Sequence, residues 1–417
     1  MTFKKSKSFA LELDQNDPLM SYRELFYYPK NGNGENVLYL CGNSLGLQPK
    51  SVRSFVEQEL NVWEKDGVLG QHGRWEKFHE KLINNSARLV GANPSEVVVM
   101  NALTVNINLL LISFYQPSRT RHKILIEKGA FPSDQYAVES QIKLHGFDPK
   151  ESLIELAPKR GESTLRTEDM VEKIEEIGGE LATIIMGGVN YYTGQAFDME
   201  AVTKAGKSVD AFVGFDLAHA AGNIKLDLHD WNVDFAAWCT YKYLCAGPGA
   251  PSGIFVNEIH HNWTGPRLAG WWGQNKQTRF EMGPDFDPIL TAEGWQISNA
   301  PVLGMTPLLA SMEIYDEVGM DKIRDKSEKM TGYMEFLLQK NLSEVTIMTP
   351  NDPIQRGCQL SLVVPGGKSI FESIFDRGVV CDWREPNVIR IAPHPLYNRY
   401  SEIYEFVQIL MQTVRGQ

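Results

Sequence analysis

Cysteine is scarce in this sequence, and its few copies are widely scattered. Five cysteines occur among 417 residues, at positions 41, 239, 245, 358 and 381, and no two of them form a CxxC pair. An odd number of cysteines at such spacings fits reduced thiols better than a disulfide framework. The sequence therefore gives no sign of a small secreted protein held together by disulfides.

Excess positive charge and long apolar runs are also missing. The formal net charge of −11 argues against a basic surface for nucleic acid phosphates. No stretch approaches the roughly 18 apolar residues of a membrane span. The N-terminal "MTFKKSKSFALELDQNDPL" has lysines but lacks the apolar core of a signal peptide. We therefore expect a cytoplasmic protein that binds neither nucleic acid nor a membrane.

Several common ligand-binding motifs are incomplete. "GNGENV", from Gly32, lacks the third glycine of a dinucleotide fingerprint, and "PGGKS", at 365–369, lacks the earlier glycine of a P-loop. "HEKLI", from His79, has no second histidine four residues further on, as a zinc protease helix would. No metal site is predicted.

The length of the chain exceeds what one hydrophobic core usually organises, so about two or three domains are expected. In the middle of the chain, short apolar runs alternate with helical patterns, which is typical of a mainly parallel sheet covered by helices. After about Pro301 a long helical stretch precedes short strands, which predicts a smaller α+β domain. We predict an N-terminal arm (1–60) that joins this small domain, a large domain (61–300) and the small domain itself (301–417). The strands predicted for the large domain are 96–100, 122–127, 181–187, 211–216, 234–239 and 252–256.

Polar and aromatic residues follow these strands at the points where ligands bind. In open α/β sheets, ligands lie beyond the carboxyl ends of the strands. One lysine, one aspartate, an aromatic ring and several hydroxyls are expected to converge at this edge, whereas "NYYTG", at 190–194, receives no assignment. The residues in question are Leu103 and Thr104, "FPSD" at 131–134, Asp216 with His219, and Tyr241 with Lys242.

This combination meets the needs of pyridoxal phosphate. That cofactor takes a lysine for its Schiff base, a carboxylate to keep its pyridine nitrogen protonated, and a phosphate cradle of backbone N–H groups and hydroxyls. Lys242, in "WCTYKYLCAGPG", follows a strand on a glycine-rich turn and is placed to form the Schiff base and to move a proton. Asp216 lies between the apolar "AFVGF" and the small "LAHAAG", which predicts a buried carboxylate with a cationic partner.

Each of these residues also has a plainer interpretation. A lysine between strands is more often solvated surface, and Asp216 could cap a helix. Phe131 could belong to the core, Ser133 could cap a helix, and His219 could be a hydrogen-bonded core histidine. Their convergence on one edge of the sheet favours the cofactor interpretation.

Eight ordered blocks of the sequence resemble the kynureninase family of fold-type-I pyridoxal-phosphate enzymes, over nearly the whole chain. The resemblance implies the α/β fold-type-I PLP-dependent transferase fold, in which a large domain with a mainly parallel seven-stranded sheet is joined to a smaller α+β domain. It also implies hydrolytic Cβ–Cγ cleavage of L-kynurenine to anthranilate and L-alanine, a step of tryptophan catabolism, by a homodimer with shared active sites. The blocks are "YLCGNSLGLQPK", "MNALTVN", "FPSDQYAVESQ", "FDLAHAAGN", "WCTYKYLCAGPG", "LAGWWGQ", "ISNAPVL" and "IRIAPHPLYN".

The resemblance further implies a role for individual residues. Arg390 would bind the substrate carboxylate, with Ser44 close by, because a guanidinium presents a fork that fits a carboxylate. His72, in "GVLGQHGRW", is displaced relative to the family pattern, so its contact with the substrate ring and the preference between kynurenine and its 3-hydroxy form stay open. The residues implied for the cofactor are Leu103, Thr104, Ser133 and Tyr241 around the phosphate, Phe131 on the ring, Asp134 and His219 in the pocket, Asp216 at the pyridine nitrogen, Lys242 at the aldehyde, and Trp271 and Asn299, which the partner subunit could supply.

The resemblance also implies that catalysis rests on Lys242, Tyr241 and Asp216, with Tyr241 as a proton relay.

Two alternatives to the kynureninase function remain. A cysteine desulfurase-like lyase would need a mobile nucleophilic cysteine, and Cys381 in "DRGVVCDW" is the candidate, although its place after "GVV" is typical of a buried strand residue. The chain could also bind the cofactor without turnover, but the presence of Lys242, Asp216 and Arg390 argues against this.

Overall fold

The strand and helix pattern in the middle of the chain forms one seven-stranded sheet in the computed structural model, which describes residues 2–416. The strand order is β2-β8-β7-β6-β5-β3-β4; β8 is antiparallel to both of its neighbours, and all other pairs are parallel. The predicted mainly parallel sheet is confirmed. The strands are β2 (Val97–Met100), β3 (Lys123–Glu127), β4 (Leu153–Leu156), β5 (Leu181–Gly187), β6 (Phe212–Asp216), β7 (Phe235–Trp238) and β8 (Ser252–Val256).

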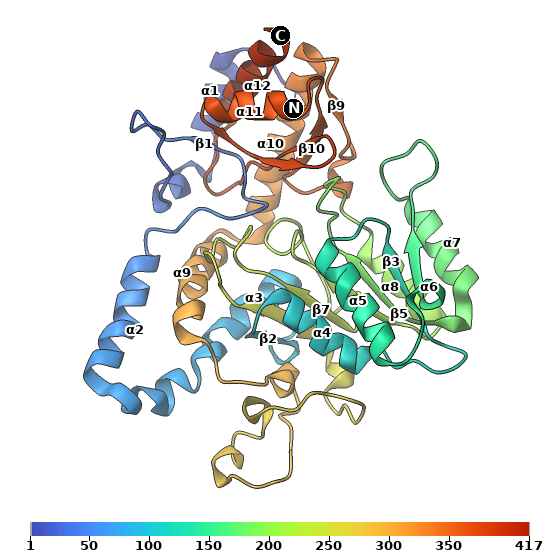
Figure 1. The fold of residues 1–417 in the computed structure, drawn as a ribbon. Coiled ribbons are helices and arrows are strands. Elements are labelled where there is room, and N and C mark those ends of the chain that lie inside the picture. Colours follow the sequence, from blue (N-terminus) through green and yellow to red (C-terminus); the bar gives the residue numbers. More distant parts are fainter. Residues whose placement is uncertain (1, 417) are drawn as a thin grey trace.

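Helices cover both faces of this sheet (Figure 1). Successive side chains of a strand point to opposite faces, so that in β2 Val97 and Val99 join one apolar cluster while Val98 and Met100 join another. The result is a three-layer α/β/α body. The helices on the Val98 face are α4 (Leu103–Phe114) and α5 (Pro132–Leu144); those on the Val97 face are α3 (Ile83–Val90), α7 (Thr167–Ile177), α8 (Met199–Ser208) and α9 (Val302–Val318).

The strand that sequence reasoning missed is β4. The other strands of this sheet lie where they were predicted, with each end displaced by no more than 1 residue. β4 is an edge strand that pairs only with β3, and most of its residues are partly or fully exposed. Because it is not buried on both faces, its short sequence "LIEL" lacks the long apolar run that marked the central strands.

A second body lies above the carboxyl ends of the large sheet in Figure 1. It contains a four-stranded antiparallel sheet in the order β12-β13-β10-β9, covered by helices with their own apolar core. The strands are β9 (Thr346–Ile347), β10 (Leu360–Val363), β12 (Asp382–Arg384) and β13 (Val388–Ile391); the helices are α10 (Met320–Asn341), α11 (Lys368–Asp376) and α12 (Tyr400–Arg415).

The N-terminal segment packs on this second body. Helix α1 (Lys7–Gln15) contacts α12, and β1 (Leu38–Tyr39) pairs in parallel with β11 (Val379–Val380). Helix α2 (Val52–Asp66) then packs on α9 beside the large sheet. The division of the chain at residues 60 and 300 stays a prediction.

A segment with little regular structure, residues 257–301, lies below the large sheet in Figure 1, on the side away from the second body. It follows β8 and contains only short helical turns before α9 begins. Several of its large apolar side chains are exposed, namely Ile259, Leu268, Trp271, Phe280, Met282, Phe286 and Leu290.

Within residues 2–416, no helix is long and apolar enough to cross a membrane.

Candidate active site

A cavity of about 430 Å³ opens at the carboxyl ends of the large sheet, between the two bodies. Strands β3, β5 and β6 end at its wall in Glu127, Gly187 and Asp216, as expected for an open α/β sheet. The structure brings most of the predicted site residues together here. Those that line the cavity are Ser44, Leu103, Thr104, Phe131, Ser133, Asp134, Asp216, His219, Tyr241, Lys242 and Arg390.

Lys242 lies on a turn that several contacts hold in place. Its ammonium nitrogen lies 6.0 Å from the centroid of the Phe131 ring and 5.9 Å from that of Tyr241. The carbonyl of the next residue, Tyr243, accepts a hydrogen bond of 2.9 Å from Nε2 of His394. Burial lowers the pKa of His394 to about 4, so this imidazole is neutral and donates through Nε2. The turn therefore presents the lysine to the cavity from a rigid support.

The motif "CGNSLGL" contacts the same turn from the N-terminal segment. The Gly46 N–H donates a hydrogen bond of 2.9 Å to the carbonyl of Tyr241. A Cβ atom at Gly46 would lie 2.4 Å from the carbonyl oxygen of Lys242, a distance that no side chain tolerates. This close approach of two backbones explains the glycine and places the neighbouring Ser44 at the cavity.

Three buried carboxyl groups, Glu127, Asp134 and Asp216, adjoin one another in the cavity wall. Burial, followed by the adjacent charge of Asp216, raises the pKa of Asp134 well above its ordinary value. Burial also raises the pKa of Asp216, although Lys242, the Ala218 N–H at 2.7 Å from Oδ1, and a hydrogen bond from Asp134 oppose the rise. Burial raises the pKa of Glu127 to about 7. Asp216 is thus the group of this set best placed to remain ionised, with Asp134 as a neutral donor beside it.

This end of the cavity suits a bound cation. Oδ1 of Asp134 and Nδ1 of His219 are buried and have no hydrogen-bond partner among residues 2–416. Burial, then the charges of Lys242, Arg390 and Arg384, hold the pKa of His219 well below its ordinary value, so its imidazole is neutral. A protonated ring nitrogen beside Asp216 would supply the positive partner that a buried carboxylate needs. These buried acceptor groups therefore fit a pyridinium, whose ring N–H donates a hydrogen bond and carries positive charge.

Two helix N-termini border the cavity and suit an anion. Helix α4 begins at Leu103 after Ala102, and α5 begins at Pro132 after Phe131; neither preceding residue caps its helix with a side chain. The backbone N–H groups at such a start attract phosphate oxygens. Thr104, Ser133 and Tyr241 add hydroxyl groups to the same wall. The residues present thus fit the phosphate of pyridoxal phosphate as well as its ring.

Arg390 enters the cavity from β13 of the second body. Its guanidinium is almost fully buried; Nη1 donates to the Tyr191 carbonyl at 2.8 Å, and Nη2 donates to Ser44 Oγ at 3.1 Å and to Asp382. Burial lowers its pKa from the ordinary value, and the nearby carboxylate of Asp382 opposes this. Nε has no partner in the part of the chain that the structure describes. These contacts fix the guanidinium at the cavity, where its charge and shape suit an incoming carboxylate.

Three predicted site residues lie outside this cavity. His72 follows α2, and its exposed ring contacts Glu76, with 3.0 Å between Nδ1 and Oε1. Trp271 and Asn299 both belong to the segment 257–301 and are exposed; the indole N–H of Trp271 donates to the Arg279 carbonyl at 3.0 Å. The single chain therefore does not place these residues at its own cavity.

Sequence reasoning missed several residues at or behind the cavity wall. Glu127 ends a strand as Asp216 does, and this position could have revealed it. Tyr191 lies in the unassigned segment "NYYTG", whose place after β5 was a usable signal. Asp382 and Arg384 lie in "CDWR" on β12, which offered no signal because their relation to Arg390 depends on strand pairing.

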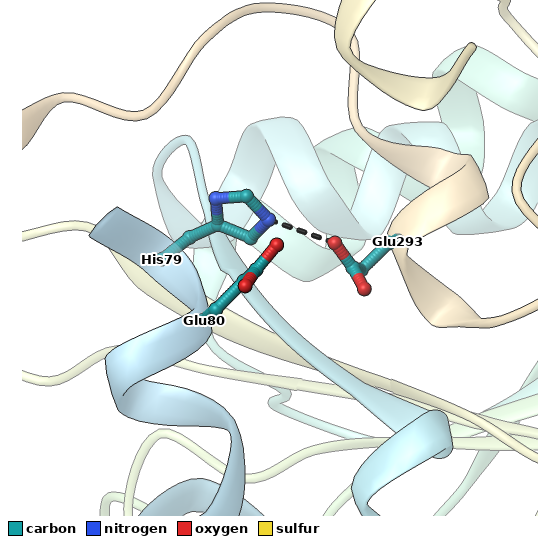
Figure 2. Close-up of side chains that lie close together, drawn as sticks. All are labelled: His79, Glu80 and Glu293. Carbon is teal, nitrogen blue, oxygen red and sulfur yellow. Dashed lines mark hydrogen bonds and ion pairs between the residues drawn. The ribbon is translucent and has the colours of Figure 1, made fainter. Parts of the chain in front are cut away.

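A second cluster of ionisable groups is shown in Figure 2, and none of its residues lines the cavity. The side chains of His79, Glu80 and Glu293 approach one another closely enough to suggest metal ligands, and Nε2 of His79 lies 2.8 Å from Glu293. The ammonium of Lys276 lies 2.8 Å from a carboxylate oxygen of both glutamates. This lysine already supplies the positive charge that the two carboxylates need, so we assign no metal to the cluster.

Solved structures show to which class this fold belongs. The apo cysteine desulfurase of Thermococcus onnurineus NA1 is 18% identical, with a TM-score of 0.76 over 91% of this chain and 95% of that chain. A variant of C-DES with glycine covalently linked to its PLP cofactor is 14% identical, with a TM-score of 0.77 over 93% and 98%. The chain thus has the fold of the fold-type-I pyridoxal-phosphate enzymes.

Sequence relatives identify the family within this class. Kynureninases from Christiangramia forsetii, Koribacter versatilis and Myxococcus xanthus are 51%, 53% and 53% identical to this chain and cover 99%, 97% and 98% of it. The alignments also cover 99%, 97% and 97% of the relatives' own lengths. The sequence profile described as "Kynureninase C-terminal domain" matches residues 323–410. The chain belongs to the kynureninase family.

Proposed function

We propose that this protein hydrolyses the Cβ–Cγ bond of L-kynurenine to give anthranilate and L-alanine, with pyridoxal phosphate as its cofactor. The observation that carries the proposal is the arrangement of Lys242, Asp216 and Arg390 around one cavity. The membership of the kynureninase family selects this reaction from those that the fold supports. The cleavage is a step of tryptophan catabolism.

The cofactor supplies an electron sink for the carbanions that form during cleavage. Lys242 would hold its aldehyde carbon covalently and, once released, move a proton at the substrate Cα. Asp216 would keep the ring nitrogen protonated, and Phe131 would lie against the ring. The N-termini of α4 and α5, with the hydroxyls of Ser133 and Tyr241, would hold the phosphate.

Substrate binding uses the second body. Arg390 and Ser44 hold the α-carboxylate and so direct the rest of the substrate towards Lys242. Water must add to the γ-carbonyl before the Cβ–Cγ bond breaks, and the carbonyl oxygen then needs a proton. Burial, followed by the neighbouring Cys239, raises the pKa of Tyr241, which keeps its hydroxyl protonated and able to donate.

A homodimer with shared active sites would explain the positions of Trp271 and Asn299. Both residues lie outside their own chain's cavity, on the segment 257–301, whose exposed apolar side chains need a covering surface. We infer that this segment completes the cofactor site of the partner subunit.

His72 is retained as a candidate contact to the substrate ring. We expect the dimer to work in the cytoplasm, in keeping with five buried free cysteines.

Replacing Arg390 by alanine is expected to raise KM for L-kynurenine at least thirtyfold. Removing the arginine from a buried arginine–carboxylate ion pair costs about 2–5 kcal/mol of binding free energy, and about 1.4 kcal/mol corresponds to a factor of ten in affinity. Initial rates over a range of kynurenine concentrations, followed by anthranilate fluorescence, give kcat and KM separately. Arg88→Ala is the matched control, because Arg88 forms its ion pair with Asp316 on the exposed surface. An unchanged KM in Arg390→Ala would show that another group binds the carboxylate.

Replacing Cys381 by alanine is expected to leave kynurenine cleavage almost unchanged. This thiol is buried in the core of the second body, and burial raises its pKa well above the ordinary value, so it is no mobile nucleophile. Assays of anthranilate from kynurenine and of sulfide from cysteine, on wild type and variant, test this. Sulfide release that disappears in Cys381→Ala, together with inactivity towards kynurenine, would favour a desulfurase.

A further inference from the structure

A second guanidinium group lines the same end of the cavity as Arg390. Arg384 belongs to β12, which pairs in antiparallel register with β13 so that Asp382 lies opposite Arg390. Residues two apart on a strand share a face, so Arg384 and Asp382 point to the same side as Arg390. Arg384 keeps about a third of its side chain exposed, whereas Arg390 is almost fully buried. Pairing of β12 with β13 thus places a partly exposed cation beside a buried one.

Asp382 connects the two arginines from behind. One of its carboxylate oxygens, Oδ1, lies 2.8 Å from Nη1 of Arg384, and the other, Oδ2, accepts from Arg390 Nη2 and from the Ser44 hydroxyl. Asp382 is not part of the cavity wall, whereas both arginines and Ser44 are. A single carboxylate therefore orients two cations that face the cavity.

The charges at this end of the cavity do not cancel. Arg384 and Arg390 contribute two positive charges and Asp382 contributes one negative charge, while Ser44 is neutral. One positive charge remains for a ligand. Glu127, Asp134 and Asp216 line the same cavity and adjoin one another, but neither arginine forms an ion pair with them. An anionic group of the substrate is the ligand that this charge distribution selects.

We propose that Arg384 is a second residue that binds the α-carboxylate of the amino acid substrate, and that Asp382 is a positioning residue which aims both guanidinium groups at it. This inference rests on the proposed function, in which Arg390 is the principal carboxylate-binding residue. Arg384 adds selectivity for a free carboxylate over an uncharged substituent at the same position, because a carboxylate offers two oxygens and can accept from both arginines.

The experiment compares a carboxylate with its uncharged analogue on the holoenzyme. L-Alanine and L-alaninamide are titrated into the protein, and the absorbance of the bound cofactor gives a dissociation constant for each. We expect Arg384→Gln to weaken L-alanine binding about tenfold and to leave L-alaninamide binding within about twofold, since a hydrogen bond to a charged group is lost only for the carboxylate. Arg384→Lys keeps the charge and should recover part of the loss.

Asp382→Asn tests the positioning role with a nearly isosteric side chain. We expect KM for kynurenine to rise about tenfold while kcat changes less than about threefold, because ground-state and transition-state binding of the carboxylate weaken equally. The preference for L-alanine over L-alaninamide should fall in parallel. A rise in KM without a change in this preference would overturn the positioning role.

Other variants separate this inference from the proposed function. Arg88→Gln, in a surface ion pair remote from the cavity, should leave both dissociation constants unchanged. If Arg390→Ala abolishes the preference for L-alanine but Arg384→Gln does not alter it, only the inference is wrong. If neither variant alters it, the proposed carboxylate site is wrong as well. If Arg384→Gln instead weakens binding of pyridoxal phosphate to the apoenzyme and spares the preference, the residue serves the cofactor and the inference falls.

Discussion

The Lys242→Ala variant is expected to lose covalent attachment of the cofactor and to cleave L-kynurenine at least about a thousandfold more slowly than wild type. Lys242 has two proposed roles, because it holds the cofactor and moves a proton. Loss of a positioned acid–base group alone lowers the rate by a factor of about 10²–10⁴. Its turn is supported on two sides, by Gly46 from the N-terminal segment and by His394 from the second body. Among residues 2–416, no other lysine lines the cavity to take over the role.

Borohydride reduction followed by peptide mapping measures this directly. In the wild type, the reduced cofactor should be found on Lys242, and in Lys242→Ala it should be removable by dialysis. Lys143→Ala is the control, because Lys143 is an exposed lysine that pairs with Glu139 on α5, outside the cavity wall. A cofactor label on any lysine other than Lys242 would contradict the central assignment.

The central strands and the edge that carries the site could be predicted because burial leaves a strong local signal. Runs such as "LATIIMG" are apolar on both faces, which identifies a strand between two helical layers. Asp216 and Lys242 could be placed at one edge because the carboxyl ends of parallel strands meet there. The roles of Arg390 and Ser44 came only from the family resemblance, since no local pattern joins residues so distant in the chain.

Residues whose positions depend on pairing between distant segments could not be predicted. Asp382 and Arg384 face the Arg390 end of the site through the register of β12 on β13. This register leaves no pattern in the sequence. Trp271 is different, because the single chain leaves it exposed and outside the cavity, so its contact with the cofactor stays a prediction.

The Asp216→Ala variant is expected to bind pyridoxal phosphate more weakly and to slow cleavage at least about a hundredfold. Asp216 ends β6 at the cavity, where Oδ1 accepts the Ala218 N–H at 2.7 Å and the carboxylate lies close enough to Lys242 to feel its charge. Breaking a buried ion pair costs about 3–5 kcal/mol, and each 1.4 kcal/mol is about tenfold in rate or affinity. Equilibrium dialysis gives the cofactor dissociation constant, and rapid-mixing measurements with deuterium at the substrate Cα isolate the proton-transfer step.

Asp134→Asn provides the matched comparison for Asp216, because the two carboxyl groups adjoin in the same buried wall. Burial and the charge of Asp216 raise the pKa of Asp134 well above its ordinary value, which favours its protonated, hydrogen-bond-donating form. An asparagine amide can keep that donation, and the variant should therefore lose much less than Asp216→Ala. If the two variants lost cofactor affinity and proton-transfer rate equally, the pyridine nitrogen would depend on the pair rather than on Asp216 alone. Near-normal turnover in Asp216→Ala would mean that another group holds the ring nitrogen, and Asp134 and Glu127 are the remaining carboxyl groups in the cavity wall.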